Sequence, residues 1–183
     1  MMNNKGLTQY YKIKYLDECA KFDIENLIDI KEQSKRYNIN PELVFGIITL
    51  EKMSRGDLLT RIIEKLIFYL CPFYLIKINA SLGIGQVRIL TAIRVLEGIG
   101  NYEALKLLMK PRSNIEIVSK LLYKYHCEVS NKESNNIEVI KCISNLYITG
   151  HQNPKENLQT DMHSLLLTWS INNQLFKESF DKN

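Results

Sequence analysis

The stretch NPELVFGIITLEKMSRG, residues 40–56, decides the fold class of this chain. Asn40 is a good helix cap, Pro41 suits the first helical position, and Glu42 suits the positive end of the helix dipole. The apolar residues that follow recur with a helical period, and the glycine at the end of the stretch is a helix breaker. We therefore predict a helix from Pro41 to about Met53.

The same helical period runs through nearly every other segment of the chain. With 183 residues and 45% hydrophobic content, the chain suits one domain with a core and is too short for two comfortable ones. We expect an all-α, compact multi-helix domain, with residues 37–153 as its main unit and residues 1–36 and 154–183 as helical segments packed on it. The expected helices cover residues 7–36 (one or two helices), 58–70, 86–96, 102–109, 113 or 114 to 127, 137–147 and 161–180, with loops at 72–81 and 128–136.

Composition excludes several classes of protein. The net charge of +4 is mild, and no cluster of lysines and arginines forms a stripe, so nucleic acid is not an expected partner. The four cysteines and three histidines lack the spacings of a zinc site, so we expect no metal. The most apolar run, LIFYLCPFYLI (residues 66–76), is too short to span a bilayer, so no transmembrane segment is expected. We expect this run to be a buried helix that ends near Pro72.

Glu51 occupies an unusual position in the helix that begins at Pro41. The spacing of Val44, Ile47, Ile48 and Glu51 places this carboxyl group on an apolar stripe. Burial disfavours the charged form, so the pKa of Glu51 should rise, as a general acid requires. The alternatives are that Glu51 tips into solvent or pairs with Arg55 one turn later.

A second polar residue in apolar surroundings lies in the stretch ASLGIGQVRILTA, residues 80–92. Gly83 and Gly85 allow close backbone approach or positive φ angles. We expect Gln86 to stand at the head of the following helix, where its amide can hold a sugar hydroxyl or an N-acetyl group. The alternative is an ordinary glycine-containing turn.

Together these stretches resemble the lytic transglycosylases, a group within the lysozyme-like superfamily on the goose-type lysozyme side. The resemblance covers about residues 37–150 and would make this chain a divergent member. Its main pieces are NPELVFGIITLE (40–51) and SLGIGQVRILTA (81–92). NIEIVSKLLYKY (114–125) and LYITG (146–150) match more loosely.

The resemblance implies a lysozyme-like fold and cleavage of peptidoglycan between N-acetylmuramic acid and N-acetylglucosamine, with no metal or organic cofactor. Glu51 would be the catalytic acid and then the base, forming a 1,6-anhydro product. The resemblance assigns substrate binding to Ser81, Gly83, Gly85, Gln86 and Tyr147, and the hydroxyl of Tyr147 would contact the glutamate. Asp57 would be a candidate second carboxylate if the enzyme hydrolyses like a lysozyme, unless it pairs with Arg61.

Two features depart from the family pattern. Ile148 stands where the family has an asparagine, and the segment between Glu51 and Ser81 is long and apolar. We expect this segment to complete the core; the alternatives are that it covers the groove or docks a partner or a membrane. The substitution at Ile148 leaves open a non-catalytic module that binds glycan or protein.

The location of the protein is left open by the sequence. Residues 1–21 contain no apolar core of signal-peptide length, so we expect no export route of that kind, although the implied substrate lies outside the cytoplasm. Release as in phages, a dedicated secretion system, or a leader that lies outside this sequence would resolve this conflict. The sequence does not identify a partner of the secretion-system or immunity type.

Overall fold

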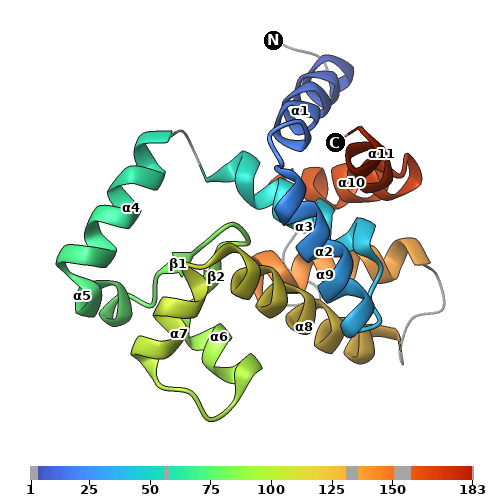
Figure 1. Cartoon of the computed structure of the whole chain (residues 1–183). Coiled ribbons are helices and arrows are strands. Elements are labelled where there is room, and N and C mark those ends of the chain that lie inside the picture. The colour runs from blue at the N-terminus through green and yellow to red at the C-terminus, as the bar shows by residue number, and fades with distance from the viewer. Residues whose placement is uncertain (1–3, 56–57, 131–135, 151–157, 183) are drawn as a thin grey trace.

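Helices form almost all of the computed structural model, which describes residues 4–55, 58–130, 136–150 and 158–182 (Figure 1). This confirms the predicted all-α class. The helices are α1 (Asn4–Cys19), α2 (Ile24–Arg36), α3 (Pro41–Ser54), α4 (Leu58–Leu70), α5 (Pro72–Lys77), α6 (Ile89–Leu96), α7 (Asn101–Leu108), α8 (Pro111–Ser130), α9 (Asn136–Thr149), α10 (Leu158–Asn172) and α11 (Leu175–Asp181). A small hairpin joins α5 to α6. Its strands β1 (Ser81–Leu82) and β2 (Val87–Arg88) pair antiparallel, with Ser81 opposite Arg88.

Helix α3 is the centre of the molecule. The Asn40 side chain accepts a hydrogen bond from the backbone N–H of Glu42 at 2.9 Å, and Pro41 opens the helix, as predicted. Every residue from Glu42 to Leu50 is buried, because α1, α2, α8, α10 and α11 all pack against α3. A helix surrounded in this way is apolar on all sides, and Glu51 follows the buried stretch directly.

The two ends of the chain meet at α3. The carboxylate of Glu42 accepts hydrogen bonds from the backbone N–H groups of Phe176 (2.9 Å) and Lys177 (3.1 Å), in the first turn of α11. The ring of Phe45 lies between the rings of Phe22 and Phe176, at centroid distances of 4.8 and 5.6 Å. These contacts fasten both terminal segments to the same helix. The boundaries at residues 36 and 153 stay a prediction.

Several element boundaries differ from the expected ones. The expected loop at 72–81 contains α5, because Pro72 starts a helix as readily as it ends one. The expected helix at 161–180 is two helices, separated where Gln174 adopts the left-handed conformation (φ 52°). Helix α8 begins at Pro111, ahead of the expected start at residue 113 or 114, and continues to Ser130. Most of the expected loop at 128–136 lies outside the described residues.

The expectation that residues 66–76 form a buried helix is wrong, and so is the expectation that this apolar part of the segment between Glu51 and Ser81 completes the core. Leu66, Tyr69 and Phe73 are 55%, 77% and 78% exposed, and Leu75 alone in this run is fully buried. Helix α4 packs chiefly on α5, and both lie at the edge of the molecule, away from α9, α10 and α11 (Figure 1). Among the described residues, no helix is both long enough and apolar enough to cross a membrane.

Candidate functional site

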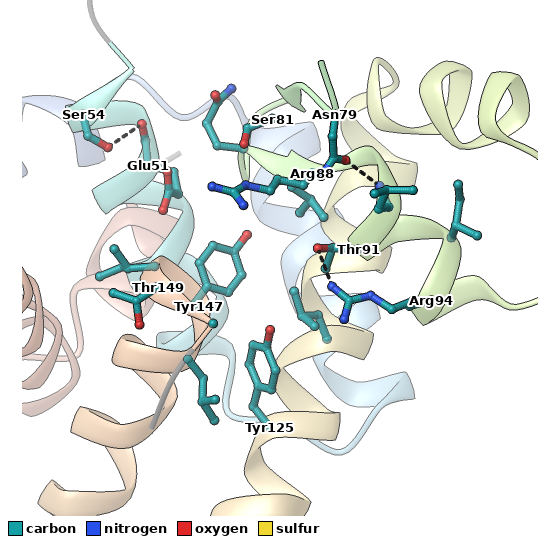
Figure 2. A pocket seen from close by; sticks show the side chains of 18 of the residues that line it. Glu51, Ser54, Asn79, Ser81, Arg88, Thr91, Arg94, Tyr125, Tyr147 and Thr149 are labelled. Atoms are coloured by element: carbon teal, nitrogen blue, oxygen red, sulfur yellow. Dashed lines mark hydrogen bonds between the residues drawn. The ribbon is translucent and has the colours of Figure 1, made fainter. Parts of the chain in front are cut away.

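A cavity of about 570 Å³ lies between the end of α3, the hairpin, α6 and the end of α9 (Figure 2). Four of the six residues singled out in the sequence line it: Glu51, Ser81, Gln86 and Tyr147. The other two, Gly83 and Gly85, belong to the hairpin behind the cavity wall. The volume of the cavity falls within the roughly 300–1,000 Å³ typical of small-molecule sites. The fold therefore brings together residues that are up to about half of the chain apart.

Glu51 enters the cavity from the last turn of α3. Burial raises its pKa from the ordinary 4.5 to about 7, because the apolar surroundings penalise the charged form. Arg55, its expected alternative partner, forms an ion pair with Glu64 of α4 and donates to the carbonyl oxygen of Gly83 at 3.2 Å. Near neutral pH, Glu51 is therefore a carboxyl group that can either give or take a proton.

The glycines of the hairpin are required by close packing. Gly83 has a φ of 75°, and a Cβ atom there would lie 2.2 Å from the carbonyl oxygen of Leu108. A Cβ atom at Gly85 would lie 2.3 Å from Cγ2 of Val118. Both positions exclude a side chain, because contacts this short cannot be relieved without moving α7, α8 or the hairpin. The backbone of the hairpin can thus approach α8 closely enough to be held by it.

Gln86 lies in the turn of the hairpin, and its expected place at the head of a helix is wrong. Its φ is 47°, β2 follows it, and helix α6 begins only at Ile89. Its side-chain Nε2 donates to the carbonyl oxygen of Gly83 at 2.9 Å, which fixes the side chain at the cavity wall. The position can still present an amide to a ligand, but the hairpin orients it and no helix dipole acts on it.

Tyr147 connects α9 to the hairpin. Its hydroxyl donates to the carbonyl oxygen of Gly85. Burial, with the nearby charge of Glu51 as the next cause, raises the pKa of Tyr147 well above its ordinary value. The Tyr147 hydroxyl therefore holds the hairpin in place. It also lies close enough to Glu51 for the two groups to interact electrostatically. Ile148, the departure from the family pattern, lines the same cavity.

Asn114 is the residue that the sequence reasoning missed as part of this site. Its side chain is fully buried in α8, accepts from the backbone N–H of Gly85 at 2.8 Å, and donates to the carbonyl oxygens of Leu82 and Leu108, both at 3.0 Å. From the sequence, Asn114 is expected only near the start of its helix, where it opens the loosely matching stretch 114–125. The available signal was an asparagine in line with Val118 on the apolar stripe of its helix, the same kind of signal that identified Glu51.

Two arginines give the cavity its charge. Arg88 of β2 and Arg94 of α6 line the wall opposite Glu51, and Figure 2 shows both side chains reaching towards the cavity. Among the described residues, Glu51 is the one acidic residue in the lining, and its raised pKa leaves it partly neutral near pH 7. Burial lowers the pKa of His163, another lining residue, which favours its neutral form. The cavity is therefore suited to an anionic or neutral polar ligand.

Two further expectations concern a metal site and a second catalytic carboxylate. Within the described residues, no group of three or more histidine, cysteine, aspartate or glutamate side chains could hold a metal ion. Asp57, the candidate second carboxylate, lies outside the described residues.

Comparison of the chain with family models, with curated proteins and with solved structures finds no match. The case for a function therefore depends on the residues of the cavity and on their chemistry.

Proposed function

We propose that this chain is a glycosidase that cleaves peptidoglycan between N-acetylmuramic acid and N-acetylglucosamine, with Glu51 as its acid and base. The observation that carries this proposal is a carboxyl group with a pKa of about 7 in the wall of a polar cavity. A general acid is most effective when its pKa lies near the working pH. Most glutamates are fully ionised there and cannot protonate a leaving oxygen.

In the proposed reaction, the Glu51 carboxyl donates its proton to the glycosidic oxygen as the bond from C1 to that oxygen breaks. The acetamido oxygen of the muramic acid residue stabilises the positive charge that develops at C1, as in the substrate-assisted glycosidases. The Glu51 carboxylate then takes the proton of the C6 hydroxyl, whose oxygen bonds to C1. The products are a 1,6-anhydro sugar, a shortened glycan and a protonated Glu51, so the proton balance closes.

Other residues of the cavity support a charged glycan as the substrate. The rings of Tyr125 and Tyr147 and the side chains of Ser81 and Gln86 offer apolar faces and polar groups side by side, which sugars require. Arg88 and Arg94 can bind the lactyl or peptide carboxylates that peptidoglycan carries and chitin lacks. The second candidate is a non-catalytic glycan-binding module, favoured by the apolar Ile148 in the cavity lining.

The test is product analysis of purified peptidoglycan after incubation with the wild type, with Glu51→Gln and with Glu103→Gln. Glu103 is an exposed glutamate on α7, so its substitution is a matched control. We expect 1,6-anhydro muropeptides from the wild type and the control, and a loss of at least about a hundredfold in rate for Glu51→Gln.

The other outcomes separate the alternatives. Reducing-end products that disappear in Glu51→Gln would mean a lysozyme-type hydrolase that uses the same acid. Glycan binding by all three proteins without soluble products would establish the non-catalytic module and refute the proposed activity.

A further inference from the structure

A set of exposed apolar residues lies on α4, on α5 and at the residue that follows α5, outside the cavity lining. We call it the apolar arm. Its members are the exposed residues Ile62, Ile63, Leu66, Tyr69, Leu70, Phe73, Tyr74 and Ile78. Single exposed apolar residues are ordinary, but a group of them on two helices that pack together points to a site of interaction.

The arm has a clear inner and outer face. On α4 the exposed residues Ile62, Leu66 and Tyr69 follow one another at helical spacing, whereas Ile67 and Phe68 point the other way and pack against the core. Helix α4 is thus apolar on both faces, and only one of them is covered. Helix α4 lies at the edge of the molecule (Figure 1), and the side chains of a single helix form a convex ridge, so a broad surface fits it better than a peptide that needs a groove.

The charges on the arm are basic. Between Ile62 and Ile78 the sequence contains one acid, Glu64, and two lysines, Lys65 and Lys77. Glu64 is on the inner side of α4 and forms an ion pair with Arg55 of α3, whereas both lysines are exposed. The apolar arm therefore carries a net positive charge, because Lys65 and Lys77 are exposed and the charge of Glu64 is neutralised by Arg55.

We propose that the apolar arm docks the protein on the surface of a membrane that contains anionic lipids. Amphipathic helices with aromatic and aliphatic residues on one face and lysines beside them lie in the headgroup region, with the lysines reaching the phosphates. Aromatic residues of this kind are also common in protein interfaces, so it is the two exposed lysines beside the arm that favour an anionic membrane surface as the occupant. The proposal is independent of the glycosidase activity.

Docking through this arm would also place the cavity near the membrane. The chain runs from α5 directly into Asn79 and Ser81, two residues of the cavity wall. Asn79 is fixed there, because its side chain accepts from the backbone N–H of Leu90 at 2.9 Å. A ligand of the cavity would thus be bound close to the lipid surface.

The test is co-sedimentation of the full chain with two kinds of vesicle, phosphatidylcholine alone and phosphatidylcholine mixed with phosphatidylglycerol. We expect binding to the mixed vesicles that weakens as salt is added. Leu66→Ser should weaken it about tenfold, because an apolar side chain no longer enters the headgroup region. Each of Lys65→Gln and Lys77→Gln should weaken it about fivefold, equivalent to about 1 kcal/mol.

Matched controls are available on α1. Ile13 is 53% exposed, close to the 55% of Leu66, and Lys14 is an exposed lysine beside it. Ile13→Ser and Lys14→Gln should bind the mixed vesicles as the wild type does. Substitutions at exposed positions should leave the fold intact, which circular dichroism would check.

Three results would overturn the proposal. The first is no binding to the mixed vesicles. The second is equal weakening by the α1 controls and the arm variants. The third is a wild-type dimer in sedimentation equilibrium that Leu66→Ser dissociates, since this would assign the arm to a second copy of the chain.

Discussion

At the scale of single residues, Glu51 couples the candidate chemistry to stability. Its pKa of about 7 in the folded protein lies above the value of about 4.5 expected in the unfolded chain. A raised pKa in the folded state means that the folded protein holds the proton more tightly. The resulting stabilisation is complete below about pH 4.5 and is lost as the pH rises to about 7. Above that pH, folding has to bury a charged carboxylate.

Substitution of Glu51 by glutamine should therefore stabilise the protein at high pH. A neutral amide of similar shape avoids the cost of burying the charge, so we expect Glu51→Gln to raise the free energy of unfolding at about pH 8 by up to about 3 kcal/mol. At about pH 4 the two proteins should be equally stable. Urea unfolding at both pH values measures this, and an equal difference at both would show that packing, and not charge, is responsible.

At the scale of elements, the hairpin depends on α8 and α9 more than on its own strands. Two residues in each strand form a short ladder that is not stable alone. Asn114 binds three backbone groups of the hairpin and the α7 end, and Tyr147 binds a fourth. The wall that carries Ser81 and Gln86 is therefore positioned from outside.

Removal of the Asn114 side chain should loosen this wall. Asn114→Ala leaves the N–H of Gly85 without its partner in a buried place, so we expect a loss of about 3 kcal/mol in the free energy of unfolding. Ligand binding in the cavity should weaken as well. Asn101→Ala, at an exposed position on α7, is the control for urea unfolding. A loss below about 0.5 kcal/mol would mean that the hairpin is held by other contacts.

At the scale of the whole molecule, α3 holds the terminal segments around a single core. The carboxylate of Glu42 is the polar link, because it caps the first turn of α11 through two backbone N–H groups. Such a link between residues far apart in the chain cannot be read from either segment alone. It sets how firmly the C-terminal helix is docked.

Loss of this cap should open α11 locally. In Glu42→Ala we expect the amide hydrogens of Phe176 and Lys177 to exchange at least about tenfold faster than in the wild type, because two charge-assisted hydrogen bonds are lost. Amides in α8 should be unaffected. Glu178→Gln, on the exposed side of α11, is the matched control for hydrogen exchange measured by NMR. Unchanged exchange at Phe176 would show that its ring packing alone docks the helix.

The sequence by itself determined the local features of this protein. Helical periodicity predicted the all-α class, and the cap at Asn40 predicted the start of α3, because both depend on residues within a few positions of one another. The same periodicity placed Glu51 on an apolar stripe, and its burial follows from the helices that surround α3.

Only the tertiary structure decided the turn conformation of Gln86, the structural use of Asn114 and the exposure of residues 66–76. An apolar run reads the same whether a neighbour covers it or not, so its sequence predicts burial and cannot show that α4 keeps one face open. A polar side chain on an apolar stripe likewise shows that a partner is needed but not which one. These properties depend on contacts between segments that are distant in the chain, and such contacts form only when the helices pack.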